Sequence, residues 1–278
     1  MLHEVIHLNK FYNLENDPWI EICVPYNNDQ VQREKSKAII IVPGGGYGFV
    51  SLREGDPVAL AYMSEGFVTI KLNYTINKKY PIPMQELGCA IDYLRNNCEK
   101  YHIDKNKIAI IGFSAGGHLV SSYGYLYKHK DFISKTNLNP EDIKPNCIVS
   151  SYPVITMYEY THEGTKNIIT GNEENLKELL SVEKHIDSTY PPTFVWTTME
   201  DTCVPPINSE MFVEALKTHN VKHDSFFYPY FDHGCSIISP LLYPTDILQD
   251  ERMQELSKWF PKTVNFINKI FKETNLNL

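Results

Sequence analysis

The sequence feature that most constrains this chain is Gly112-Phe113-Ser114-Ala115-Gly116, which stands between an apolar run and a helical pattern. The run Lys107–Ile111 predicts a buried strand, and a helix is expected from about Ala115. A strand that turns so sharply into a helix holds its middle residue in a strained conformation and exposes that side chain at the end of the sheet. The residues two before and two after the serine are then pressed together, so both must lack a Cβ. The pattern predicts Ser114 as a nucleophile, with a non-catalytic turn or a phosphate cradle as alternatives.

The rest of the chain alternates short β-branched runs with longer amphipathic segments. This is typical of an α/β fold with a mostly parallel central sheet flanked by helices. Further strands are expected at 38–42, 67–72, 147–150, 193–196 and 225–228, and helices at 56–66, 83–101, 173–180, 206–216 and 251–271. No repeat or linker divides the 278 residues, so a single domain over 1–278 is expected. Residues 152–191 interrupt this alternation of strands and helices. We expect them to form a small cap or lid over the carboxyl edge of the sheet, where active sites lie.

A glycine run, Pro43-Gly44-Gly45-Gly46-Tyr47-Gly48, directly follows the expected strand at 38–42. An acyl-transfer enzyme needs two backbone N–H groups aimed at its tetrahedral intermediate, and glycines let the backbone approach the substrate closely. We expect these donors of the oxyanion hole to be Ala115 and either Gly45 or Gly46. A dinucleotide-binding fingerprint is not met, because Phe49 stands where its third glycine belongs and no helix follows at once.

The acid and the base of such a site follow the serine in the chain, the acid first. Among the later histidines, only His233 lies in a turn that follows a convincing strand, so it is the expected base. Asp201, just past a predicted strand, is the expected acid that orients the imidazole. Glu200 is its nearest rival, and Asp232 is expected to point elsewhere. A helix cap is the alternative role for Asp201.

Composition and the remaining motifs exclude other classes of function. The formal charge of −8 argues against nucleic-acid or anionic-membrane partners. No apolar stretch approaches membrane-spanning length, and no signal peptide is seen, so a cytoplasmic protein with six reduced cysteines is expected.

His3-Glu4-Val5-Ile6-His7 satisfies the zinc-protease pattern, but that pattern works only on a helix and this segment fits an extended strand equally well. We therefore expect no metal and no cofactor. His118, one turn along the helix after Ser114, is expected to be structural.

These motifs together resemble the α/β-hydrolase esterases related to acetyl xylan esterases and to the hormone-sensitive-lipase group. The resemblance covers about Ala38 to His233 and rests on residues 43–47, 53–59, 112–119, 152–155, 191–194, 201–205 and 233–234. Lipase-like relatives carry histidine before the glycine run, so Pro43 points toward the sugar-esterase branch. The resemblance implies hydrolysis of short acyl esters, with acetylated xylo-oligosaccharides or other sugars among the candidates, and thus a small-molecule ester as partner. Tyr47 and Tyr152 are the expected substrate contacts, although tyrosines are more often packing residues.

The predicted function is carboxylic ester hydrolysis by Ser114, His233 and Asp201. A serine peptidase related to the prolyl oligopeptidases is the first alternative, although no propeller-sized N-terminal domain is seen to select peptides. A non-catalytic ligand-binding relative on the same fold is the second alternative, and an intact set of three side chains argues against it.

Overall fold

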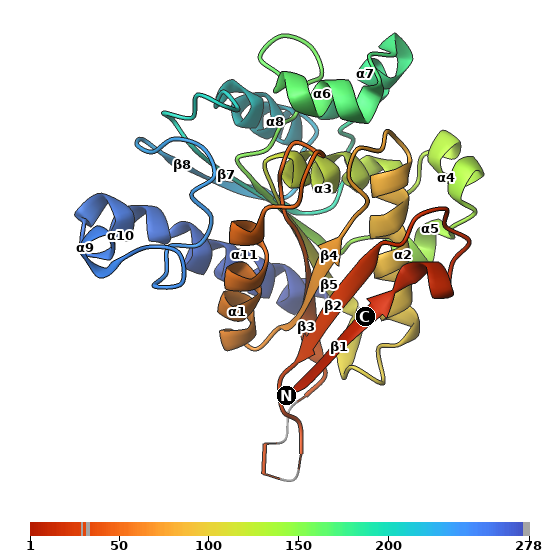
Figure 1. Ribbon diagram of the computed structural model, residues 1–278, viewed down its shortest axis with the longest axis vertical. Coiled ribbons are helices and arrows are strands. Elements are labelled where there is room, and N and C mark those ends of the chain that lie inside the picture. Colours follow the sequence, from red (N-terminus) through yellow and green to blue (C-terminus); the bar gives the residue numbers. More distant parts are fainter. Residues whose placement is uncertain (29, 32–33, 275–278) are drawn as a thin grey trace.

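The computed structural model describes residues 1–28, 30–31 and 34–274. Within these residues, eight strands form one sheet in the order β1-β2-β4-β3-β5-β6-β7-β8 (Figure 1). The parallel strands are β3 (Ser36–Val42), β4 (Val68–Asn73), β5 (Ile103–Phe113), β6 (Cys147–Ser151), β7 (Thr193–Thr198) and β8 (His223–Tyr228). β1 (Leu2–His7) and β2 (Trp19–Val24) add two antiparallel strands at one edge. The expected mostly parallel sheet is confirmed, and its parallel strands all end at the same edge.

Both faces of the sheet are buried, which explains why its central strands are continuous apolar runs. In β3, Ile40 packs into one apolar cluster and Ile39 and Ile41 into another, because successive side chains point to opposite faces. The first cluster includes side chains of α2 (Ile82–Asn96), α3 (Ala115–Leu126) and α8 (Ile207–Thr218). The second includes side chains of α1 (Asp56–Ser64) and α11 (Trp259–Thr274). Helices on both faces therefore hold the strand ends that carry the site.

The helix expected at 251–271 is two helices, α10 (Glu251–Ser257) and α11, which follow the short α9 (Thr245–Leu248). Pro261 explains the break. It has no N–H to donate to the carbonyl of Ser257, and proline is tolerated in the first turn of a helix but not in its interior. The helix expected at 83–101 ends at Asn96, and β5 begins earlier than expected, at Ile103.

Several short elements are absent from the sequence-based prediction. Among them are α4 (Lys130–Thr136), α5 (Pro140–Ile143) and the 3-10 turns η1 (Leu8–Lys10), η2 (Leu52–Glu54) and η3 (Val182–Lys184). His3 and His7 lie on the strand β1, so they do not share a helix face as the zinc-protease pattern requires. Among the described residues, no group of three His, Cys, Asp or Glu side chains is placed to hold a metal ion. None of the described helices is both long and apolar enough to cross a membrane.

The chain between β6 and β7 contains α6 (Glu163–Thr170), α7 (Glu174–Leu180) and η3. In Figure 1, α6 and α7 lie at the top of the molecule, above α3 and next to the loop that follows β3. Two contacts tie α6 to this end of the sheet. The N–H of Tyr80 donates to the carbonyl of Ile169 over 3.0 Å, and a Cβ at Gly48 would lie 3.5 Å from Ile168 Cδ1. The segment 152–191 is thus packed against the glycine run.

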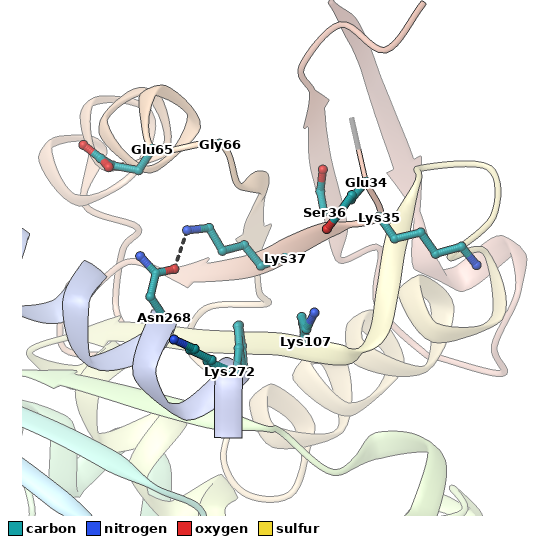
Figure 2. A pocket seen from close by; sticks show the side chains of 10 residues that line it. Glu34, Lys35, Ser36, Lys37, Glu65, Gly66, Lys107, Asn268 and Lys272 are labelled. Carbon is teal, nitrogen blue, oxygen red and sulfur yellow. Dashed lines mark hydrogen bonds between the residues drawn. The ribbon is translucent and has the colours of Figure 1, made fainter. Parts of the chain in front are cut away.

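The opposite edge of the sheet carries a separate pocket of about 450 Å³ (Figure 2). It lies where β3 begins, between the ends of α1 and α11, and its lining includes four lysines together with Glu34 and Glu65. Lys37 Nζ donates a hydrogen bond across it to Asn268 Oδ1 over 2.5 Å (Figure 2). Because Ser114 follows the other end of the parallel strands, this pocket is distinct from the site described next.

Candidate active site

Ser114 stands at the turn between β5 and α3, with φ 55° and ψ −119°. This left-handed conformation is strained for a residue with a side chain, and such strain persists only where the surrounding structure imposes it. The two flanking glycines allow the turn. A Cβ at Gly112 would lie 2.0 Å from the carbonyl oxygen of Gly116, and one at Gly116 would lie 2.2 Å from that of Val42. The sequence-based expectation that both positions must lack a Cβ agrees with this geometry.

Asp201 and His233 reach the serine from the loops after β7 and β8, which lie beyond β6 in the sheet. Asp201 follows β7 and is buried, and His233 lies in the loop after β8. His233 Nδ1 lies 2.6 Å from Asp201 Oδ2, and His233 Nε2 lies 2.7 Å from Ser114 Oγ. Because a carboxylate only accepts hydrogen bonds, Nδ1–H donates to Asp201, and in the neutral ring Nε2 accepts from the serine hydroxyl. The structure thus brings the three expected side chains into one chain of two hydrogen bonds.

The remaining carboxylate oxygen of Asp201 accepts from the backbone N–H groups of Cys203 (3.0 Å) and Val204 (2.8 Å). The carboxylate therefore caps a turn and contacts the imidazole at once. It does not cap the following helix, because α8 begins at Ile207 with no side-chain hydrogen bond at its cap, so the alternative role of helix cap is wrong. Its rivals face other groups. Glu200 accepts from the N–H of Phe231 over 2.9 Å, and Asp232 accepts from Thr202 and from the N–H of His233. Both acids hold the two loops together and leave Asp201 as the imidazole's partner.

Of the expected oxyanion donors, Ala115 directly follows the serine, and the glycine run approaches Ser114 at Gly44, where a Cβ would lie 2.9 Å from Ser114 Cβ. Ala115 is the first residue of α3, where helix N–H groups have no partner in the preceding turn. Among the described residues, the N–H groups of Gly45, Gly46 and Ala115 have no acceptor. Gly45 has φ 119°, and a Cβ there would lie 2.1 Å from the carbonyl oxygen of Phe49. Glycine is therefore required for this loop, and its unpaired N–H groups are available to an anion.

Glu54, which the sequence-based reasoning passed over, joins the glycine run to the histidine loop. Its carboxylate is buried and accepts from the N–H of Gly44 (2.8 Å) and from the hydroxyl of Tyr152 (2.7 Å). The Tyr152 oxygen in turn accepts from the N–H of Ser236, three residues after His233. The pKa of Glu54 is raised by burial, which outweighs the lowering by the hydrogen bonds from Tyr152 and Gly44 and by the nearby His233. The only sequence signal was an acidic residue in the resemblance motif 53–59.

The two tyrosines expected to contact substrate are both buried. Tyr152 packs edge-on against His233 and Trp196, and Tyr47 donates its hydroxyl hydrogen to His118 Nδ1 over 2.8 Å. Neither ring presents a surface on which a sugar could stack in this structure. His118 Nε2 donates to the carbonyl of Leu180 over 2.9 Å, and burial lowers the pKa of His118 to about 4. His118 therefore faces away from Ser114 and links α3 to the 152–191 segment.

His162 is a second histidine at this site that the sequence did not single out. It precedes α6, and its Nδ1 accepts from the N–H of Thr165 over 3.2 Å. A Cβ at Gly46 would lie 3.4 Å from His162 Cε1, so the ring stands against the glycine run. Burial, and then the neighbouring His233, lower the pKa of His162. A histidine directly before a helix in the 152–191 segment was the available signal.

A serine held in this way at the strand–helix turn of a mostly parallel sheet defines the α/β-hydrolase fold. Within that class, the chain belongs to the BD-FAE family, whose model matches residues 24–216. The match includes the glycine run, Ser114 and Asp201, and it ends before His233.

Relatives of the chain carry esterase and xylanase names. The chain is 34% identical over 220 residues to endo-1,4-beta-xylanase B of Butyrivibrio fibrisolvens, covering 76% of this chain and 34% of that protein. It is 26% identical over 231 residues to the acetylxylan esterase of Xylanibacter ruminicola, covering 79% of this chain and 45% of that protein. The solved structure of the acetyl ester-xyloside bifunctional hydrolase from Caldicellulosiruptor lactoaceticus is 32% identical, with a TM-score of 0.77 over 95% of this chain and 97% of that chain. The chain thus spans less than half the length of the two curated relatives and nearly all of the solved structure.

Proposed function

We propose that this protein is a serine carboxylic ester hydrolase that removes short acyl groups, acetyl above all, from small acetylated sugars. The observation that carries the proposal is the hydrogen-bonded series from Asp201 through His233 to Ser114, with distances of 2.6 and 2.7 Å. The names of the relatives support the substrate class, because an acetylxylan esterase and an acetyl ester-xyloside hydrolase are among them.

In the proposed mechanism, Ser114 Oγ attacks the ester carbonyl while His233 Nε2 takes the serine proton. Asp201 holds the ring with Nδ1 protonated and stabilises the imidazolium that forms. The negative charge on the tetrahedral intermediate is held by the N–H of Ala115 and that of Gly45 or Gly46. His233 then gives its proton to the departing alcohol. A water molecule, deprotonated by the same histidine, releases the acid from Ser114.

We further propose that residues 1–278 form one α/β-hydrolase domain in which the 152–191 segment is a cap over the site. Its support is the contact of α6 with the glycine run and the hydrogen bond from His118 on α3 to Leu180. Such a position lets the segment contact the part of the substrate that lies outside the glycine run.

The proposal is tested by steady-state hydrolysis of p-nitrophenyl acetate and of acetylated xylo-oligosaccharides. We expect Ser114→Ala to lower kcat by about 10⁶ with an unchanged circular dichroism spectrum. A fluorophosphonate probe should label the wild-type protein and not this variant, because only a nucleophilic serine reacts with it. Near-normal ester cleavage by the variant, or faster cleavage of proline anilides than of esters by the wild type, contradicts the proposal.

A further inference from the structure

The ring of His162 is fixed in one tautomer by the start of α6. Its Nδ1 accepts from the backbone N–H of Thr165 and lies 2.9 Å from the Thr165 hydroxyl oxygen. Thr165 is fully buried, so this contact anchors the ring to the helix. Because a nitrogen that accepts from an N–H carries no proton, the single proton of the neutral imidazole lies on Nε2.

That Nε2–H group is a donor without a partner. No described residue accepts from it, and the ring stands against Gly46, one of the two glycines proposed for the oxyanion hole. The ring is also close enough to His233 and Asp201 for their charges to act on it, and its pKa is lowered by burial and by His233. A neutral, oriented N–H donor therefore lies at the rim of the reacting centre, on the 152–191 segment.

The chemistry of a short acyl ester limits what this donor can meet. An acetyl group has a single carbonyl oxygen, and that oxygen occupies the oxyanion hole during the reaction. Any further oxygen within reach of the site belongs to the alcohol, and a sugar carries hydroxyl and ring oxygens on the carbons next to the ester. The p-nitrophenol released from p-nitrophenyl acetate has no oxygen on the carbons next to the ester.

We infer that His162 is a specificity-determining residue that donates a hydrogen bond from Nε2–H to an oxygen of the sugar beside the scissile ester. The inference rests on the proposed function. The glycine run and the three catalytic side chains hold the acyl group, and His162 holds the alcohol. Because the donor is neutral and its tautomer is fixed, it recognises an acceptor oxygen and gives no preference for an acidic sugar.

The substitution His162→Asn separates this role from helix capping. Asparagine is among the best N-cap residues, so it replaces Nδ1 as an acceptor for the Thr165 N–H, but it has no donor in the place of Nε2. The matched control is His185→Asn. His185 lies on the same segment, and its Nε2 already donates to the carbonyl of Glu178 over 2.8 Å.

The experiment measures kcat/KM for p-nitrophenyl acetate and for an acetylated xylo-oligosaccharide with a free neighbouring hydroxyl. We expect His162→Asn to lower the ratio of the sugar-ester value to the p-nitrophenyl acetate value about 3- to 10-fold, the range of one neutral hydrogen bond. His185→Asn should change neither value. Equal losses on both esters, or no loss on either, overturn the inference, and both variants are assayed well below their unfolding temperatures. If the wild-type protein cleaves neither ester, the result contradicts the proposed function and not the role of His162.

Discussion

Replacing Glu54 by glutamine tests whether the buried carboxylate positions the oxyanion loop. The carboxylate accepts two hydrogen bonds, from the Gly44 N–H at 2.8 Å and from the Tyr152 hydroxyl at 2.7 Å. Glutamine has almost the same shape but only one acceptor oxygen, so its amide N–H₂ faces one of the two donors. The Tyr152 oxygen already accepts from Ser236, and its own proton has no other described acceptor. One buried donor is therefore left unsatisfied whichever way the amide is turned.

The expected effect follows from that orphaned donor. A buried donor without an acceptor costs about 1–3 kcal/mol, which at about 2–4 °C per kcal/mol lowers the unfolding temperature by several degrees. If the backbone shifts instead to relieve the mismatch, Gly44 moves together with the donors at Gly45 and Gly46. Losing one oxyanion donor lowers kcat about 10²–10³-fold, so a partial displacement should lower it about 10- to 100-fold, with KM little changed.

The assay is steady-state hydrolysis of p-nitrophenyl acetate by Glu54→Gln, at a temperature well below its unfolding midpoint. Glu86→Gln is the matched control, because Glu86 is another buried carboxylate with two donors, the N–H and hydroxyl of Thr75, both at 2.6 Å. The control should change stability and keep kcat. A kcat for Glu54→Gln within twofold of the wild type would refute the positioning role.

Three further predictions concern the glycine run, the acid and the pH dependence of stability. Gly45→Ala should lower kcat/KM more than tenfold, because its Cβ would lie 2.1 Å from the Phe49 oxygen, whereas Gly48→Ala should be tolerated because its nearest neighbour is at 3.5 Å. Asp201→Asn should lower kcat by about 10⁴, since Nδ1–H loses its carboxylate, and a loss below tenfold speaks against Asp201 as the acid. Burial raises the pKa of Glu86 from 4.5 to about 7, so the folded state binds the extra proton and wild-type stability falls as pH rises through this window. Relative to the wild type, Glu86→Gln should therefore gain on the order of 3 kcal/mol between pH 4.5 and pH 8 in denaturant titrations, and an equal difference at both pH values contradicts the assignment.

The central strands and the chemistry at their ends were predictable because they depend on local patterns. Continuous apolar runs followed by glycine-containing turns located β3 and β5, and the chain order of serine, acid and base selected the other two side chains. The apolar periodicity over 251–271 predicts one helix where the structure has two, because Pro261 interrupts the helical hydrogen bonds without changing the spacing of the apolar residues around it.

Glu54 and His162 lay beyond the reach of sequence reasoning because their roles are set by tertiary contacts. Glu54 becomes meaningful only when a tyrosine 98 residues later donates to it. His162 matters because folding packs the start of α6 against Gly46, over 100 residues away in the chain. No local periodicity encodes either distance. The same holds for Tyr47 and Tyr152, whose aromatic character suggested a binding surface and whose hydroxyls are instead used inside the protein.

The sheet order divides the site into a central part and a peripheral part. Ser114 and the glycine run follow β5 and β3, which pair with strands on both sides, whereas His233 follows β8, which pairs only with β7. Elements at a sheet margin open locally at a smaller free energy than the centre does. The turn that holds Ser114 is therefore among the last parts of the molecule to unfold. The loop that holds His233 can unfold locally while the centre of the sheet stays folded. The fraction of molecules in which the complete site is formed is then smaller than the fraction that is folded. Any contact that stabilises β8 also raises the fraction of molecules that can carry out the reaction.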